Sequence, residues 1–181
     1  QQTYNNYEVI IVDDLSNDCT FEVLQAYSKI DNRVKVYRNK ENLGLVSNWN
    51  RCIQETNGTW IKFVFQDDII DPECLAQLAD ATTDGIPLIF CRRDFFLQTG
   101  VSDSIIKSYS DIPGIDHLFP GKTALTSSDI SDGILRETSN FFGEPTSTLI
   151  HKSLFSRFGL FNSNMVQLCD LEYWIRVGLN T

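Results

Sequence analysis

Two pairs of adjacent aspartates, Asp13-Asp14 and Asp67-Asp68, are the residues of this sequence best suited to carry chemistry. Each pair stands at the end of an apolar run, EVIIV before the first, and WIKFVF with one further residue before the second. Carboxylates brought together repel one another unless a cation lies between them, and Mg²⁺ or Mn²⁺ is bound by one or two carboxylates together with diphosphate oxygens. Acidic residues in these places could instead only cap the following helices. The recurrence of the pair after two strands favours the metal site.

Asp170 is a third candidate because it opens the helical pattern LEYWIRV. A carboxylate there could take the proton of an attacking hydroxyl group, or it could serve only as a helix cap. His151 ends a predicted strand at the expected mouth of the site, where it could contact a phosphate, although a single histidine is more often a surface or packing residue. Arg176 could pair with a carboxylate of its own helix or with a phosphate. Four aromatic residues could stack on a sugar ring or pack in the core: Phe141, Phe142, Tyr173 and Trp174.

Predicted strands and helices alternate around these acids. Short runs rich in β-branched residues are followed by stretches whose apolar residues recur every three or four positions. We expect strands at residues 8–12, 34–37, 60–65, 88–91 and 146–151, and helices at 21–30, 45–56, 153–158 and 170–179, with one more starting after Asp71-Pro72. This order predicts an α/β fold with a doubly wound, mostly parallel sheet flanked by helices, which binds ligands beyond the carboxyl ends of its strands. Both aspartate pairs would then lie at the same edge, with their carboxylates in one crevice.

The stretch from Arg93 to Gly143 lacks this alternation and is rich in Ser, Asp, Gly and Pro. A connection of such length inside a compact domain is usually functional or mobile. No motif in it identifies functional residues.

The overall composition excludes several classes of protein. The 181 residues carry a net charge of −9, with 42% hydrophobic residues, which indicates one globular domain and argues against binding to a nucleic-acid backbone. The five cysteines are scattered without a zinc-binding pattern, which favours free thiols in a reducing compartment. No apolar run reaches the roughly 20 residues needed to cross a bilayer. These features predict a cytoplasmic protein, and they leave open a peripheral contact at the inner face of the membrane.

The order and spacing of several motifs resemble those of family 2 glycosyltransferases with the GT-A fold. EVIIVDDLSNDCT, NLGLVSNWN and GTWIKFVFQDD stand in the order found in that family, followed by GEPTSTLIHKSLFSRFGLFN and CDLEYWIRV. The likeness covers most of the chain except about residues 93–140. One such motif alone would be weak evidence, whereas the ordered set is specific.

The resemblance implies roles for the acidic residues. It places Asp13 and Asp14 at the base and ribose of a nucleotide-sugar donor, and it assigns Asp67 to the second acid of the D-x-D motif, which contacts both donor and metal. Asp68 is a further candidate metal ligand. Mg²⁺ or Mn²⁺ would bridge the diphosphate and stabilise the leaving nucleoside diphosphate. Asp170 falls at the position of the catalytic base, which would support transfer with inversion at the anomeric carbon.

The resemblance also implies an organisation and partners. Residues 1–181 would form a single GT-A-like domain, in which 1–92 bind the nucleotide-sugar and 93–181 form the acceptor and catalytic half. The donor would be a nucleotide-diphosphate sugar, with a UDP-sugar favoured, and the acceptor a glycan or a lipid-linked molecule. The expected activity is a hexosyltransferase-like reaction on an acceptor hydroxyl, in bacterial cell-surface polysaccharide synthesis. The chain has no Q-x-x-R-W motif, which favours a non-processive enzyme.

Two departures from the family pattern leave alternatives open. Phe65 stands where the first acid of D-x-D is usual, which predicts weak metal affinity. Related proteins also have a strand and a helix before the segment that matches residues 1–14, so we expect a sheet without its first strand, whose open edge a second copy of the chain could cover in a homodimer. A catalytically silent GT-A-like binding or assembly module is therefore one alternative. A receiver-like domain, also doubly wound with paired aspartates, is another, but it leaves the region of Asp170 unexplained.

Overall fold

Two groups of strands form the centre of the protein in the computed structural model, which describes residues 1–83, 85–96, 99–137 and 139–181. In the first group, β1 (Val9–Asp13) and β2 (Val34–Arg38) pair in parallel over their whole length. The helix α1 (Thr20–Ile30) connects them, as a parallel pair requires a crossover. These three elements agree with the sequence prediction to within a residue or so at each end.

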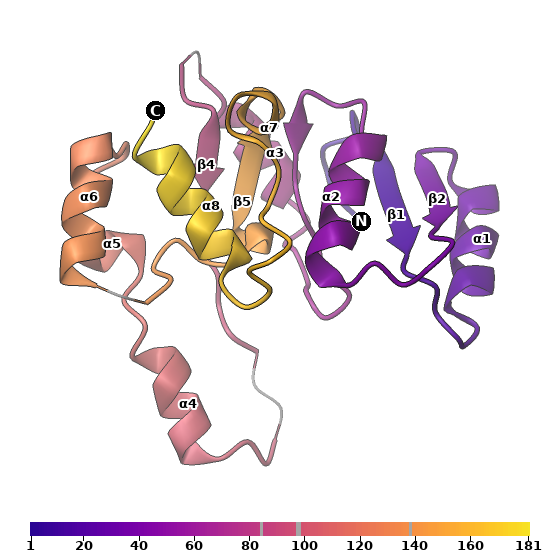
Figure 1. Cartoon of the computed structure of the whole chain (residues 1–181), viewed down its shortest axis with the longest axis horizontal. Helices are drawn as coiled ribbons and strands as arrows, with labels where there is room; N and C mark the ends of the chain where they lie inside the picture. The colour runs from indigo at the N-terminus through magenta and orange to yellow at the C-terminus, as the bar shows by residue number, and fades with distance from the viewer. Residues whose placement is uncertain (84, 97–98, 138) are drawn as a thin grey trace.

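The second group places β5 (Thr148–His151) between two shorter strands. Both β3 (Trp60–Ile61) and β4 (Leu88–Phe90) pair with it in the antiparallel sense. The carboxyl ends of β3 and β4 and the amino end of β5 therefore lie at one edge, where Figure 1 also shows the arrowheads of β1 and β2. We call this the carboxyl edge. His151, the last residue of β5, pairs with Trp60 at the opposite edge.

The two groups meet at the start of β1 and at the turn before β3. The carboxylate of Glu8 accepts hydrogen bonds from the backbone N of Asn57 (2.5 Å) and of Gly58 (3.0 Å), and it pairs with Nζ of Lys35 on β2 (2.8 Å). α2 (Leu45–Glu55) runs from the loop after β2 back to this turn. β1 and β3 therefore begin next to each other.

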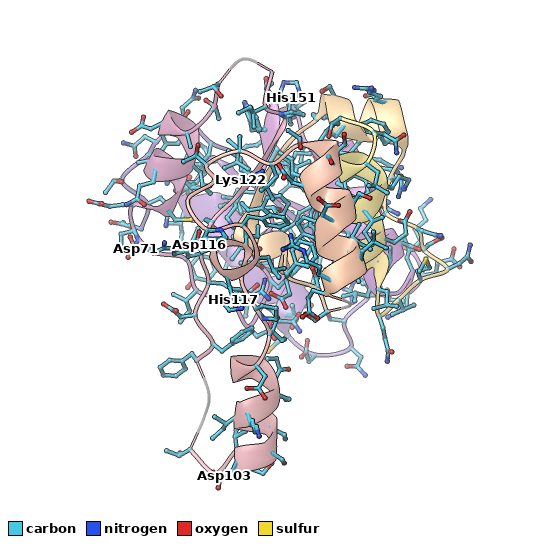
Figure 2. All side chains as sticks on the ribbon, turned by 90° about the vertical axis from the view of Figure 1, so that its left-hand side faces the viewer. Asp71, Asp103, Asp116, His117, Lys122 and His151 are labelled. Atoms are coloured by element: carbon cyan, nitrogen blue, oxygen red, sulfur yellow. The ribbon has the colours of Figure 1, made fainter. Side chains whose placement is uncertain are left out.

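Helices cover both faces of the strands. Figure 2 shows Asp71, which precedes α3 (Cys74–Asp80), on one side, and α6 (Ser127–Arg136) and α8 (Cys169–Gly178) on the other. The apolar core lies on the side of α2, α7 (Ser153–Phe158) and α8. The four aromatic residues considered for sugar stacking are part of this core and are at most 3% exposed: Phe141, Phe142, Tyr173 and Trp174.

Helices occupy much of the stretch from residue 93 to 143, contrary to the irregular chain expected from the sequence. They are α4 (Asp103–Ser110), α5 (Ile115–Leu118) and α6, whereas residues 97, 98 and 138 of this stretch lie outside the described residues. α4 projects from the body of the protein beyond the carboxyl edge (Figure 1). Over the described ranges no helix is both long and apolar enough to cross a membrane, and the five cysteines are free thiols.

Candidate active site

The carboxylate of Asp13 is held by the protein itself. Its side chain is 1% exposed and lies 3.1 Å from Nε of Arg38. It also accepts a hydrogen bond of 3.2 Å from the backbone N of Ser16, which closes the turn after β1. Because β1 and β2 pair with Asp13 opposite Arg38, the ion pair follows from the strand register. Direct contact between Asp13 and a nucleotide stays a prediction.

Asp14 holds the loop that leads into α2. Its carboxylate accepts hydrogen bonds from Nδ2 of Asn39 (2.7 Å) and from the backbone N of Leu43 (2.8 Å) and Gly44 (2.9 Å). Gly44 has a φ of 78°, a left-handed conformation that glycine adopts without strain, and α2 begins directly after it. Asp14 thereby fixes residues 42–45, the NLGL segment, against the carboxyl end of β1. Asn39, a residue that the sequence did not single out, also donates to Oδ1 of Asn48 (2.9 Å).

The second aspartate pair lies on the loop after β3 and is less enclosed. Asp67 is exposed, and Asp68 is half-buried. Oδ2 of Asp68 accepts hydrogen bonds from the hydroxyl of Thr146 and from the backbone N of Phe65 (3.3 Å). The ring of Phe65 stacks on Trp49 of α2, with 4.7 Å between the ring centroids. The residue in place of the first acid of D-x-D therefore packs against an aromatic surface.

The two aspartate pairs do not form one ligand cluster. Among the described residues, no group of three or more His, Cys, Asp or Glu side chains could hold a metal ion. The first pair is instead engaged by Arg38 and the NLGL segment, so a single metal site built from all four carboxylates is not formed by the described residues. Asp67 and Asp68 still offer two hard oxygen donors, and Mg²⁺ commonly binds through one or two carboxylates completed by substrate phosphates. These two residues fit a metal ion that binds together with a diphosphate.

Asp170 lies in the first turn of α8 and is half-buried. Burial raises the pKa of its carboxyl group, and the nearby charge of Glu144 acts in the same direction. Hydrogen bonds from the backbone N of Leu171 (2.8 Å) and from Nδ2 of Asn140 (2.9 Å) oppose this shift. A carboxylate with a raised pKa accepts a proton more readily than an ordinary one, which suits a general base.

Residues 140–146, which precede β5, connect Asp68 with Asp170. At one end Asn140 donates to Asp170, and at the other Thr146 donates to Asp68. Between them, Glu144 pairs with Nε of Arg93 at 3.1 Å. Figure 1 shows the starts of β5 and α8 at the carboxyl edge, and residues 140–146 contact one acid at each end.

Sequence reasoning did not assign roles to four residues of this site. Asn140, Glu144 and Thr146 lie in or beside the GEPTST motif, but a motif does not reveal which side chains its residues contact. Arg93 lies outside every recognised motif. The network they form is a property of the fold.

His151 and Arg176 lie elsewhere. Because β5 is antiparallel to its neighbours, His151 is at the edge opposite to the acids, and the expectation that it lies at the mouth of the site is wrong. Its Nδ1 lies 2.6 Å from Oγ of Ser153, and Figure 2 shows it at the far end of the molecule from Asp103. Nε of Arg176 lies 2.6 Å from Glu172, the pairing within the helix that was one of the two outcomes considered.

A cavity of about 380 Å³ also lies at this opposite edge, between Trp60, Ile86 and His151. Its lining includes none of the five candidate acids. We therefore place the candidate active site by the acids and not by this cavity.

Comparison with known proteins identifies the family that this chain resembles. Residues 1–157 match the family described as Glycosyl transferase family 2, so Asp170 lies beyond the matched range. EpsH of Bacillus subtilis (strain 168), assigned as a glycosyltransferase, is 36% identical over 127 residues, which make up 67% of this chain and 37% of EpsH. TuaG of the same organism, assigned as a glycosyltransferase of teichuronic acid biosynthesis, is 39% identical over 67 residues, or 37% of this chain and 27% of TuaG.

A solved structure also resembles this chain. The crystal structure of S. aureus TarS superimposes with a TM-score of 0.68 at 21% identity, covering 99% of this chain and 29% of TarS. This likeness confirms the GT-A-type α/β fold that the motifs implied. The chain spans little more than a third, or less, of each of these three proteins.

Proposed function

Because this chain belongs to glycosyltransferase family 2, we propose that it transfers a sugar from a nucleotide-diphosphate sugar, with a UDP-sugar favoured, to an acceptor hydroxyl group with inversion. The observation that supports this most directly is the connection of Asp68 and Asp170 by residues 140–146. A single displacement requires a donor-binding acid and a basic carboxylate on either side of one anomeric carbon. In this proposal residues 1–92 bind the donor and residues 93–181 supply the acceptor site and the base.

On the donor side, Asp13 and Asp14 would border the nucleotide. Both follow β1 at the carboxyl edge, where ligands bind in open α/β sheets. Their carboxylates are engaged by Arg38, Asn39 and the NLGL segment, so their main contribution would be to hold the backbone that contacts the base and ribose.

Asp67 and Asp68 would hold Mg²⁺ or Mn²⁺ together with the diphosphate. When bound, the ion supplies positive charge that stabilises the leaving nucleoside diphosphate. The net charge of −9 repels a diphosphate, and a bound cation would offset this repulsion at the site. The exposed carboxylate of Asp67 is free to turn toward the ligand.

Asp170 would act as the general base. Its carboxylate removes the proton of the acceptor hydroxyl as that oxygen forms a bond to the anomeric carbon, and the bond from this carbon to the diphosphate oxygen breaks on the opposite face. The proton remains on Asp170 and the electron pair leaves with the nucleoside diphosphate. The raised pKa of this half-buried carboxyl group supports the role.

The acceptor would be a glycan or a lipid-linked molecule in the synthesis of a bacterial surface polysaccharide, at the cytoplasmic side of the membrane. The similarity to TuaG, which is assigned to teichuronic acid biosynthesis, supports this context. Residues 93–143 are the proposed acceptor side, and their projecting helix α4 lies beyond the carboxyl edge.

A second candidate function is a catalytically silent module that keeps the fold for binding or assembly. The stacking of Phe65 on Trp49 favours it, because an aromatic residue takes the place of an acid that usually contacts the donor. Metal-dependent binding of a nucleotide separates the two functions.

Calorimetric titration with UDP and with GDP, each with and without Mn²⁺, is the test. We expect UDP to bind in the presence of Mn²⁺ at least ten times more tightly than in its absence. Tighter binding of GDP than of UDP would indicate a guanine nucleotide in the donor and would leave the proposed transferase function intact. If neither nucleotide binds, the result would contradict the proposed donor site and favour the silent module.

A further inference from the structure

Two hydrogen bonds hold the carboxylate of Asp170. One comes from the backbone N of the next residue, Leu171, at 2.8 Å from Oδ1. The other comes from Nδ2 of Asn140, at 2.9 Å from Oδ2. The first is local, because it joins two neighbouring residues of the same helix. The second comes from a different segment of the chain and determines the direction in which the carboxylate faces.

The amide group of Asn140 is itself fixed in orientation. Its Oδ1 accepts a hydrogen bond from the backbone N of Gly143 (3.1 Å), and its Nδ2 also donates to the carbonyl of Gly143 (3.2 Å). An amide oxygen that accepts from Gly143 leaves the NH₂ group for Asp170, since only that group can donate. The carbonyl of Gly143 accepts a further hydrogen bond from Nε1 of Trp174 (2.9 Å), whose side chain is completely buried. The turn formed by residues 140–143 is thus joined to α8 by two hydrogen bonds, one to Asp170 and one from Trp174.

Arg93 supports the same turn from outside. A Cβ atom on Gly143 would lie 1.6 Å from Nη1 of Arg93, so the guanidinium packs directly on the glycine. The same guanidinium pairs with Glu144 at 3.1 Å. Arg93 therefore offsets a negative charge that otherwise disfavours ionisation of Asp170.

We propose that Asn140 is a positioning residue of the transfer reaction, which holds the carboxylate of Asp170 ionised and directed toward the acceptor hydroxyl group. The inference rests on the proposed role of Asp170 as the base. A neutral amide suits this task because it donates a hydrogen bond to the carboxylate without the full charge of Arg or Lys, which would make the carboxylate a poorer proton acceptor.

The charged and titratable groups around Asp170 come from several elements. Glu144 lies on the segment before β5, and Arg93 lies on the segment after β4. α8 itself carries Cys169 and Glu172, and Glu172 is paired with Arg176. The helices that pack against α8 carry Asp129, Asp132 and Arg136 on α6, where Asp129 is paired with Lys122, and Arg157 on α7. Replacing Asn140 alters none of these groups.

Carbon-13 NMR titration of the aspartate carboxyl groups tests the proposal without a substrate. The signal of Asp170 is identified by its loss in Asp170→Asn. In Asn140→Ala we expect the pKa of Asp170 to rise by about one pH unit, because the carboxylate loses its side-chain donor. Asn140→Asp keeps an oxygen for the backbone N of Gly143 and places a second carboxylate against Asp170, so the rise should be larger.

Trp174→Phe is the matched control. It removes the other hydrogen bond to the carbonyl of Gly143 and loosens the same turn, but it keeps the contact of Asn140 with Asp170. We expect a lower melting temperature and an unchanged pKa of Asp170. An unshifted pKa in both Asn140 variants, or an equal shift in Trp174→Phe, would overturn the positioning role.

Release of UDP from a UDP-sugar, measured against pH, separates this inference from the proposed function. Loss of rate in Asp170→Asn, together with an acidic limb that moves to higher pH in Asn140→Ala, supports both. Full turnover by Asp170→Asn would overturn the base and the proposed mechanism with it. An inactive Asp170→Asn with an unmoved acidic limb in Asn140→Ala would overturn the role of Asn140 alone.

Discussion

Asp13 and Arg38 face each other across β1 and β2 as an ion pair of 3.1 Å whose carboxylate is 1% exposed. Asp67, its counterpart after β3, is exposed. Two aspartates that look equivalent in the sequence therefore have different physical tasks. Asp13 stabilises the fold, and Asp67 is available to a ligand.

Asp13→Asn should lower the free energy of unfolding by about 1–3 kcal/mol, because Arg38 and the turn at Ser16 lose a charged partner that is out of contact with water. Asp67→Asn should change it by less than about 0.5 kcal/mol, since the side chain is exposed. Urea unfolding at pH 7 measures both values. Equal costs for the two substitutions would contradict the distinction.

Asp67→Asn also tests the metal site. It should reduce the affinity for UDP in the presence of Mn²⁺ to about the value found without the metal, because the metal ion loses one of its two carboxylate ligands. Calorimetry on the folded variant provides the measurement. Metal-dependent affinity equal to that of the unaltered chain would remove Asp67 from the metal site.

Asp170→Asn should lower turnover by about 10²–10⁴-fold, the usual contribution of a general base. Affinity for UDP should stay within about twofold, because Asp170 contacts residues 140–146 and α8 but is assigned no contact with the nucleotide. Steady-state kinetics and calorimetry give the two numbers. A variant that loses affinity and keeps turnover would reverse the assignment.

The stability of Asp170→Asn should depend on pH with a definite sign. Burial raises the pKa of Asp170 in the folded protein above its unfolded value. The stability that this group contributes is then complete below the unfolded pKa and is lost as the pH rises through the folded pKa. In Asp170→Asn a neutral amide replaces the carboxyl group, so the variant does not lose stability as the pH rises. It should therefore melt at a higher temperature than the unaltered chain at pH 7, and the difference should vanish near pH 3. A lower melting temperature at pH 7 would show that the charged form is favoured by folding.

Glu8→Gln should have the opposite pH dependence. Burial disfavours the charge of Glu8, but the hydrogen bonds from Lys35, Asn57 and Gly58 outweigh burial and lower the pKa to about 2. Stability from this group is therefore complete above its unfolded pKa, near 4.5, and is lost as the pH falls through about 2. We expect Glu8→Gln to cost about 1–3 kcal/mol at pH 7 and almost nothing at pH 2. Urea unfolding at both pH values tests this, and a cost that persists at pH 2 would contradict it.

Gly143→Ala should destabilise the protein by more than a glycine in an open turn. Gly143 has a φ of 95°, and its added Cβ would meet Arg93, whereas Gly121 has a φ of 75° with nothing within 4 Å. Gly121→Ala should cost about 1 kcal/mol and Gly143→Ala about 2–3 kcal/mol. The double variant Arg93→Ala/Gly143→Ala relieves the clash and should recover part of the difference. Equal costs for the two glycines in thermal unfolding would contradict the close packing of Arg93.

Much of the secondary structure could be predicted from hydrophobic periodicity, and the direction of one strand could not. The helix predicted at 153–158 matches α7, and β1, β2 and α2 agree within a residue or so. β3 is shorter than predicted because β5 pairs only with Trp60 and Ile61. A run of buried residues has the same pattern whichever way the strand runs, so the position of His151 could not be obtained from it.

Asp67 and Asp170 could be named as candidates from the sequence, and their roles stay predictions. Asp67 and Asp170 are acids at the ends of apolar elements, and that pattern is local. The start of α6, where Thr126 and Asp129 form a capping box, was not predicted. The engagement of Asp13 by Arg38, and of Asp170 by Asn140, depends on which segments lie side by side in the folded chain, and this exceeds what spacing along the sequence can indicate.

The position of β5 between β3 and β4 has a consequence for how the protein is made. β3 and β4 are synthesised before it and have no pairing with each other; each pairs only with β5 among the described residues. Their backbone groups stay without strand partners until residues 148–151 have left the ribosome, which is about 60 residues after the end of β4. The proposed donor half, residues 1–92, should therefore not fold as an independent unit, and a split of the chain before β5 should yield two fragments that become fully ordered only on association.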